Sequence, residues 1–308
     1  MRKIFQINED FVNTRLDKWI KKSICDLPQS LIEKNIRKGK IKINNLKKKS
    51  SYKLQKNDKI ILYNFNYTAN FNKKKTYRYI PSKKDLSFSN NLFIDNNENF
   101  VVINKPSGIS VQSGTKSRKN ILDILKYTKE FSGFSPYSVH RIDKETSGLL
   151  IVAKNRKYAQ LLTSLFRIRK IHKTYLGIIM GEMSNNKGTF RDILLNYEGE
   201  KTLREKAITH FSIIDSNTNY SFIKLNPETG RKHQLRKQLF MRNHPILGDS
   251  KYRISKKIND KKNNLMLHAY KINFSINNIR YNFVAEPPND FKNCLKEKNL
   301  KNFLLWFY

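Results

Sequence analysis

Hydrophobic residues in the first part of the chain recur at the spacing of helices. One helical face is predicted by a group of four, namely Leu16, Trp19, Ile20 and Ile24. A second helix is predicted from Ser30, which precedes Glu33 at the spacing of a capping box, to Gly39, a residue type that commonly follows a helix end. We therefore expect two short amphipathic helices close to the start of the chain.

Extended structure is expected directly after these helices. The segment KIKIN at 40–44 alternates like a strand, Asn44 and Asn45 suit a turn, and residues 52–62 resume the extended pattern. Together with the helices, these segments predict a compact unit over residues 14–62, in which two helices pack on a small hairpin.

Residues 63–90 have no sustained hydrophobic period and mix polar, basic and aromatic residues. We interpret this segment as a linker. Aromatic residues interleaved with lysines can also stack on RNA bases, which is the alternative interpretation. The remaining residues, 91–308, are predicted to form a second and larger domain.

Apolar runs in the larger domain predict more strands than helices. The predicted strands are 99–108, 148–154, 173–183 and a hairpin of 208–215 with 220–225, and the predicted helices are 158–168 and 233–243. Because strands often follow one another directly, the pattern favours an α+β fold with a mixed, largely antiparallel sheet.

The net charge of the chain points to a polyanionic partner. There are 61 Lys and Arg against 25 Asp and Glu, which gives a net charge of +36. A field of this strength attracts nucleic acid. AT-rich coding would also raise the content of Lys, Asn and Ile, so the charge supports an RNA or DNA partner without identifying one.

Cysteine usage and the absence of long apolar stretches indicate a cytoplasmic protein. Cys25 and Cys294 lie far apart without metal-ligand spacing, and we expect both to be reduced and buried. The first ten residues, MRKIFQINED, lack the features of a secretory signal, and no stretch approaches the ~18 apolar residues that a membrane-spanning helix requires. A monomer is the default expectation for the oligomeric state.

Three polar residues, His140, Arg141 and Asp143, stand directly before the aliphatic pattern of residues 148–154. A turn before a strand can present side chains into a cleft, and the charge of Arg141 would keep a nearby carboxylate ionised. In such a centre His140 and Arg141 would contact the substrate; a structural ion pair is the alternative. Metal binding is not expected, because the few acids do not gather near His140 with ligand spacing.

A second polar cluster precedes the helix predicted at 233–243. It follows a turn and consists of Arg231, His233, Gln234 and Arg236. Guanidinium groups and helix N termini suit phosphate contact, so Arg231 and Gln234 are expected to bind substrate; a solvated basic helix is the alternative. Tyr175 interrupts another strand-like run and, taken alone, fits a core tyrosine.

Six segments in order along the chain resemble the motifs of the RluA-type pseudouridine synthases. They are NKPSGISVQSG, HRIDKETSGLLIVAKN, KTYLGIIMGEM, TGRKHQLR, HPILGDSKY and LHAYKINF. Residues 14–62, with TRLDKWI, IRKGKIKIN and LQKNDKIIL, similarly resemble the alpha-L RNA-binding module of ribosomal and tRNA-synthetase proteins. The layout is most similar to the family members that modify large-subunit (23S) ribosomal RNA. The resemblance implies the pseudouridine synthase fold for the catalytic domain.

The resemblance also implies roles for five residues. Asp143, from the HRxD motif, would be the catalytic residue, and Arg141 before it would help to displace the target base from its stack. Tyr175, from the KxY motif, would stack on the flipped uracil and is a candidate for removing a proton. Arg236 would pair with Asp143, and Leu235 would pack in the pocket.

The chain departs from the family pattern at two positions. Gln238 stands where the family usually has a His, which puts any role of that His in doubt, and Ile142 replaces the commoner Leu with little change of volume. The implied reaction, isomerisation of uridine in RNA, needs no cofactor and no metal. The expected partner is large-subunit ribosomal RNA or its assembly intermediates. The alternatives are a transfer-RNA uridine, a non-catalytic RNA-binding assembly factor and, more remotely, a nuclease.

Overall fold

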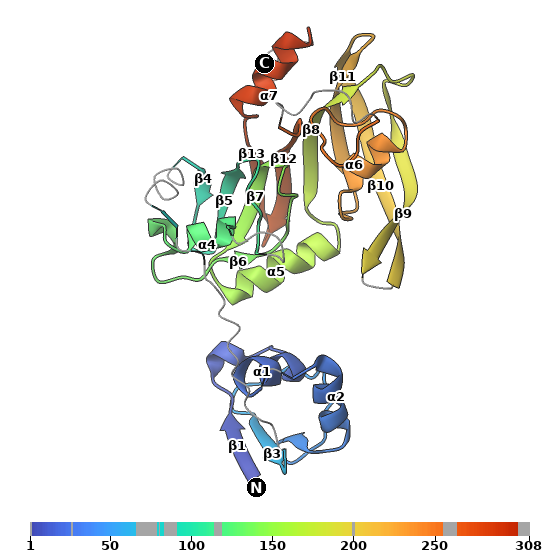
Figure 1. The fold of residues 1–308 in the computed structure, drawn as a ribbon. Coiled ribbons are helices and arrows are strands. Elements are labelled where there is room, and N and C mark those ends of the chain that lie inside the picture. Colours follow the sequence, from blue (N-terminus) through green and yellow to red (C-terminus); the bar gives the residue numbers. More distant parts are fainter. Residues whose placement is uncertain are drawn as a thin grey trace. The chain divides into compact units, whose positions relative to one another are not determined.

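The computed structural model describes residues 2–25, 27–65, 79, 81–82, 91–113, 119–198, 201–254 and 264–300. Contacts divide the chain into two compact units, Met1–Tyr77 and Arg78–Tyr308 (Figure 1). Most of the predicted linker, residues 63–90, lies outside the described residues. No helix among the described residues is long and apolar enough to cross a membrane.

The first unit combines two helices with a three-stranded sheet. Its elements are β1 (Arg2–Gln6), η1 (Glu9–Phe11), α1 (Leu16–Ser23), α2 (Gln29–Arg37), β2 (Ile41–Ile43) and β3 (Lys59–Tyr63). The strands are antiparallel in the order β1-β3-β2. Both helices bury their apolar faces in one core with the sheet, including Leu16 and Ile32, which are fully buried. The expected hairpin therefore gains a third strand, β1.

The local signals in this unit are partly confirmed. Gly39 has a φ of +71°, and its N–H donates to the Ile36 carbonyl, as expected after a helix end. The capping-box prediction is wrong, because the N-cap of α2 is Pro28, two residues before Ser30, and it makes no side-chain cap hydrogen bond. Before β3, the buried Asp58 holds the chain by accepting hydrogen bonds from the Gln55 N–H and the Tyr52 hydroxyl.

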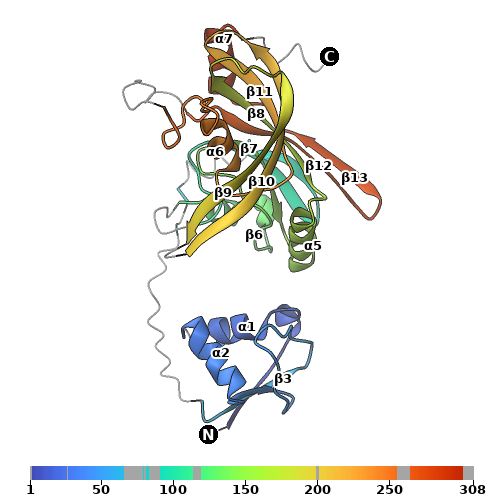
Figure 2. The ribbon, with the colours of Figure 1, turned by 90° about the vertical axis from the view of Figure 1, so that its right-hand side faces the viewer.

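The second unit is built on one ten-stranded sheet (Figures 1 and 2). Its strands are β4 (Phe93–Asn96), β5 (Phe100–Lys105), β6 (Tyr137–Ser138), β7 (Ser147–Ala153), β8 (His172–Met180), β9 (Lys187–Glu198), β10 (Lys201–Ser216), β11 (Tyr220–Pro227), β12 (Leu267–Ile276) and β13 (Ile279–Val284). The main order is β4-β5-β7-β12-β8-β11-β10-β9, while β6 pairs with β7 and β13 with β12. Every ladder is antiparallel except β7 with β12, which confirms a mixed, largely antiparallel sheet.

The helices of this unit are α4 (Ile121–Leu125), η2 (Lys129–Phe131), α5 (Arg156–Arg167), α6 (Gln234–Phe240) and α7 (Asn289–Glu297). In Figure 1, α6 lies over the part of the sheet that contains β9, β10 and β11. Lys237 on α6 secures this packing by donating to the Leu195 carbonyl of β9, and Leu235 and Leu239 enter the apolar core. The predicted helices at 158–168 and 233–243 are confirmed as α5 and α6.

The parallel seam between β7 and β12 is short and tight. It pairs only His268 with Ser147 and Ala269 with Gly148. Gly148 has a φ of +109°, and a Cβ at this position would lie 2.3 Å from the Ala269 carbonyl oxygen, so the approach requires glycine. The fully buried His268 contacts the Ser147 hydroxyl at 2.9 Å and the Ala285 carbonyl at 2.8 Å. This seam fixes the start of β7 at Ser147, four residues after Asp143.

Candidate functional site

Asp143 lies in the loop between β6 and β7, and the backbone of that loop is clamped from one side. The Ser107 hydroxyl donates to the Glu145 carbonyl at 2.6 Å, and the Gly108 N–H donates to the Lys144 carbonyl at 2.9 Å. The carboxylate itself makes no hydrogen bond within the described residues, and 21% of the side chain is exposed. The loop therefore presents an ionisable group on a rigid support, as catalytic groups require.

Lys105 completes this clamp and was not singled out from the sequence. Its ammonium group is fully buried and donates to three carbonyl oxygens, those of Pro106, Ile109 and Lys144. Burial lowers the pKa of Lys105 to about 7, although Glu145 and Asp143 oppose this shift. The sequence did contain a signal for this role: Lys105 ends the apolar strand β5, and a lysine in such a buried position needs partners for its charge.

Arg236 projects from the first turn of α6 among three carboxylates. Its Nε and Nη2 donate to the buried Asp249 at 2.7 Å each, while Nη1 lies 3.7 Å from Asp143 and 3.4 Å from Glu145. The predicted neighbour of Asp143 is thus in place, but its tightest partner is Asp249. Sequence reasoning missed Asp249, which lies in the quoted segment HPILGDSKY and carried no local signal of its own.

His233 and Tyr252 complete the polar surroundings of Asp143. The Nε2 atom of His233 lies 3.8 Å from Asp143 Oδ1, and its Nδ1 lies 3.2 Å from the Tyr252 hydroxyl. Tyr252 also contacts Arg236, whose guanidinium carbon lies 5.3 Å from the ring centroid. Asp249 holds the Tyr252 backbone, since it accepts from the Tyr252 N–H at 2.9 Å.

Tyr175 lies on β8 and is paired with Ala269 of β12 and Leu225 of β11. Its half-buried ring packs against two parts of the core. Burial, and then the negative charge of Asp143, raise the pKa of Tyr175 well above its usual value. The phenol is therefore protonated at neutral pH, and its hydroxyl shares the electrostatic surroundings of Asp143.

Among the predicted contacts to substrate, Arg141 and Arg231 differ in their partners. Arg141 is exposed and makes no hydrogen bond or ion pair within the part of the chain that the structure describes, so its guanidinium is available to a ligand. Arg231 instead donates to Glu205 at 3.0 Å and to the Lys206 carbonyl at 3.2 Å.

The other predicted contacts to substrate are engaged within the fold. His140 accepts from the Ile151 N–H at 2.9 Å and stacks on Phe166, and burial lowers its pKa to about 3. Gln234 is buried and accepts from the Thr229 hydroxyl at 2.7 Å, and Leu235 is a core residue. The structure thus brings Asp143, Tyr175 and Arg236 together, whereas His140, Gln234 and Leu235 have structural partners within the fold.

Gln238, the departure from the expected motif, has a structural environment. It is fully buried, accepts from the Thr209 hydroxyl at 2.7 Å and donates to Asp192 at 2.7 Å. Asp192 also accepts two hydrogen bonds of 3.1 Å from the Arg242 guanidinium. These bonds fasten α6 to β9 and β10. No group of three or more His, Cys, Asp or Glu side chains among the described residues is placed to hold a metal ion.

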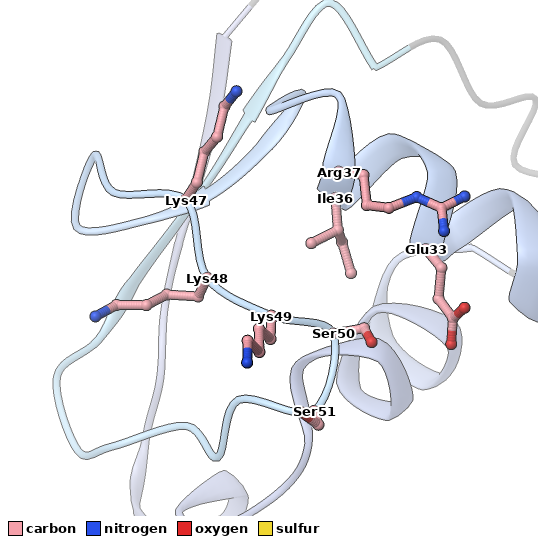
Figure 3. Close-up of a pocket in the computed structure, with 8 residues that line it drawn as sticks. All are labelled: Glu33, Ile36, Arg37, Lys47, Lys48, Lys49, Ser50 and Ser51. Atoms are coloured by element: carbon pink, nitrogen blue, oxygen red, sulfur yellow. The ribbon is translucent and has the colours of Figure 1, made fainter.

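The first unit carries a separate basic pocket of about 470 Å³. Figure 3 shows it between the end of α2 and the loop before β3. The residues that line it are Glu33, Ile36, Arg37, Lys47, Lys48, Lys49, Ser50 and Ser51. Arg37 and the three lysines outnumber the single acid, Glu33, so the surface at this pocket is basic and suits an anionic ligand such as a phosphate backbone.

Comparison with known proteins identifies relatives over most of the chain. A family model described as RNA pseudouridylate synthase matches residues 99–240. The chain is 32% identical over 305 residues to the ribosomal large subunit pseudouridine synthase C of Buchnera aphidicola subsp. Baizongia pistaciae, covering 94% of this chain and 95% of the relative. It is 33% identical over 271 residues to the protein of the same name from Rickettsia conorii, covering 85% and 89%.

Solved structures share the fold of the second unit. Human RNA pseudouridylate synthase domain containing 4 superposes with a TM-score of 0.61 at 23% identity, covering 71% of this chain and 98% of that protein. Human RNA pseudouridylate synthase domain containing 1 gives a TM-score of 0.56 at 22% identity, covering 70% and 90%. At these identities the likeness supports the fold, whereas the curated relatives carry the assignment of the family.

Proposed function

The chain belongs to the RNA pseudouridylate synthase family, whose members are isomerases, and we propose that its substrate is uridine in large-subunit (23S) ribosomal RNA. Two relatives at 32% and 33% identity are named for the large ribosomal subunit. The net charge of +36 suits a polyanionic substrate of this size. The names of these relatives carry the proposed substrate, and the partly exposed carboxylate of Asp143, flanked by Arg236, supports the proposed chemistry.

The reaction breaks the N1–C1′ bond of uridine, turns the base and joins C5 to C1′. The proton on C5 is released and N1 gains a proton, so the product is an isomer of the substrate. Asp143 is the proposed essential group: it attacks the sugar, attacks the base or removes a sugar proton. Its carboxylate suits each of these routes because the nearest guanidinium atom lies 3.7 Å away, so its oxygens are not held in a short ion pair.

The target nucleotide must leave the RNA stack for the carboxylate to reach the sugar, at a cost of a few kcal/mol. Arg141 is proposed to occupy the vacated position, because it is exposed and unpaired among the described residues. Tyr175 is proposed to stack on the extruded uracil. Its raised pKa keeps the hydroxyl protonated, so stacking is better supported than removal of a proton by a phenolate.

The first unit is proposed to bind the RNA away from the reacting nucleotide. Its resemblance to the alpha-L module covers residues 14–62, and the basic pocket lies within that range. The division of labour is then an RNA-binding unit, a connecting segment over residues 63–90 and a catalytic domain over residues 91–308. Phosphate contacts outside the site add affinity without specifying sequence.

The substrate assignment is tested by mapping pseudouridine after reaction with unmodified 23S ribosomal RNA and, separately, unmodified total transfer RNA. Carbodiimide treatment followed by primer extension marks each new pseudouridine as a stop. Enzyme-dependent stops in 23S RNA support the proposal. Stops in transfer RNA alone overturn the substrate, and tight RNA binding without stops in either RNA favours the assembly-factor alternative.

A further inference from the structure

His233 occupies a backbone conformation that few non-glycine residues adopt. It precedes α6 with a φ of +54° and a ψ of +32°, in the left-handed region, and its side chain makes no hydrogen bond to cap the helix. Non-glycine residues in this region are uncommon, and they persist where the surroundings hold them in place, often at functional sites. The side chain of His233 therefore serves something other than the start of the helix.

The imidazole instead joins Tyr252 to Asp143. Its Nδ1 lies 3.2 Å from the Tyr252 hydroxyl, and its Nε2 lies 3.8 Å from Asp143 Oδ1. On the other side of the same carboxylate, Arg236 Nη1 lies 3.7 Å from Oδ2. The two carboxylate oxygens thus face two different nitrogen groups at similar distances.

The partners of the imidazole define which nitrogen carries its proton. The Asp143 carboxylate can only accept, so we assign the donor role to Nε2, which leaves Nδ1 to accept from the Tyr252 hydroxyl 3.2 Å away. A neutral imidazole that accepts at Nδ1 carries its proton on Nε2. The Nε2–H group then faces Asp143 as a neutral dipole, whereas Arg236 faces it as a full positive charge.

We propose that His233, oriented by Tyr252, is a positioning residue that aligns the Asp143 carboxylate for reaction together with Arg236. This inference rests on the proposed role of Asp143. One oxygen is oriented by a neutral donor and the other by a cation. The two contacts therefore fix the orientation of the Asp143 carboxylate, and only one of them brings a positive charge. Hydrogen bonds of this kind commonly shorten only when substrate is bound, so both gaps are compatible with an unliganded site.

The arrangement depends on His233 staying neutral. Burial lowers the pKa of His233; Asp143 opposes this shift, and Arg236, Lys251 and Lys232 support it. The Tyr252 hydroxyl contacts the imidazole directly, and two further acids, Asp249 and Glu145, contact Arg236. Protonation would place a second positive charge against Asp143 and restrain its reactivity. The rate of the wild-type enzyme should therefore fall with pH below 6.5.

The test is a set of single-turnover rates on 23S RNA between pH 5 and 8.5, with RNA affinity and melting temperature measured in parallel. His233→Asn fits the left-handed backbone but is too short to reach Asp143. It should lower the rate at pH 8 at least about tenfold with RNA affinity and melting temperature unchanged. His233→Gln reaches further and cannot titrate, so it should recover part of the rate and remove the decline below pH 6.5.

Tyr252→Phe provides a second test that does not depend on the His233 variants. It keeps the ring beside Arg236 and removes only the hydroxyl, so the rate should fall several-fold. Combined with His233→Asn, it should add no further loss, because Tyr252 acts through His233. His210→Gln is the matched control: His210 is an exposed residue that pairs with Glu228, and this variant should behave as wild type.

A wild-type rate in His233→Asn, or a wild-type pH profile in His233→Gln, would overturn the inference. Additive losses in the double variant would also overturn it, because Tyr252 would then act independently of His233. Asp143→Asn separates this inference from the proposed function. If Asp143→Asn is active, the role of Asp143 fails; if it is inactive while the His233 variants are unaffected, only the positioning role fails.

Discussion

Asp249 receives two hydrogen bonds of 2.7 Å from Arg236, and this pairing leaves Nη1 of the same guanidinium turned toward Asp143. The Asp249 carboxylate also accepts from the backbone N–H groups of Lys251 and Tyr252. One buried acid therefore fixes both the arginine and the loop that carries Tyr252. Asp249 therefore sets the direction of Arg236, and Nη1 is turned toward Glu145 at 3.4 Å and Asp143 at 3.7 Å.

Asp249→Asn should impair both folding and catalysis. It removes the negative charge that balances a buried guanidinium, so the free energy of unfolding should fall by about 3 kcal/mol. Arg236 would then turn toward Asp143 and neutralise it, and turnover should fall at least about tenfold. Urea unfolding and single-turnover rates measure the two effects.

The control for Asp249→Asn is Glu286→Gln, at an exposed ion pair with Lys292. It should change the free energy of unfolding by less than about 1 kcal/mol. Equal effects of the two substitutions would contradict this account.

Gly148→Ala should disrupt the seam between β7 and β12. The new Cβ would lie 2.3 Å from the Ala269 carbonyl oxygen, and no flexible side chain can yield there. We expect a loss of several kcal/mol in the free energy of unfolding and a loss of activity, because the Asp143 loop leads into this seam. Gly133→Ala separates strain from contact, since Gly133 has a φ of +78° but open space around it. Its loss should be about 1 kcal/mol, and a similar loss at Gly148 would contradict the steric argument.

The stability of the second unit should fall in acid because of His268. Burial lowers the pKa of His268 to about 4, so the unfolded chain binds a proton at higher pH than the folded chain. The stabilisation is complete above pH 6.5 and is lost as the pH falls through 4, at most about 3 kcal/mol in total. His268→Gln should therefore show a shallower decline in unfolding free energy between pH 6.5 and 4 than wild type. An unchanged slope would exclude His268 as the source.

The basic pocket of the first unit should contribute to the salt dependence of RNA binding. Replacing Lys47, Lys48 and Lys49 together by Ala should weaken binding to 23S RNA and reduce the slope of log affinity against log salt by up to about 2 to 3. The matched triple replacement by Arg keeps the charges and should keep the slope. Filter binding over a range of salt concentrations measures both variants. An Ala variant with the wild-type slope would place the RNA contacts elsewhere.

The sequence predicted the parts of the fold whose signal is local. β7 is buried on both faces and therefore reads as a continuous apolar run, whereas α5 is buried on one face and shows the helical period; both predictions are confirmed. β1 escaped prediction because its side chains are mostly exposed and its pairing with β3 is made by the backbone. In β9 the exposed Ile193 and Leu195 flank the buried Leu194, which conceals the alternation.

The sequence motifs predicted individual residues of the site but not the contacts between them. Asp143, Tyr175 and Arg236 followed from the resemblance, and the structure brings them together. The groups that support them depend on contacts between distant segments. Lys105 reaches the Asp143 loop across 39 positions, and Asp249 meets Arg236 across 13, so neither pairing leaves a local signal.

The central claim is that Asp143 is the essential group of the isomerisation. The most direct measurement is release of tritium from 23S RNA whose uridines are tritiated at C5, compared between wild type and Asp143→Asn at equal RNA occupancy. The carboxylate makes no hydrogen bond within the described residues, so the variant should fold and bind RNA as wild type does. We predict that its rate falls by several orders of magnitude. A rate within about tenfold of wild type would contradict the account.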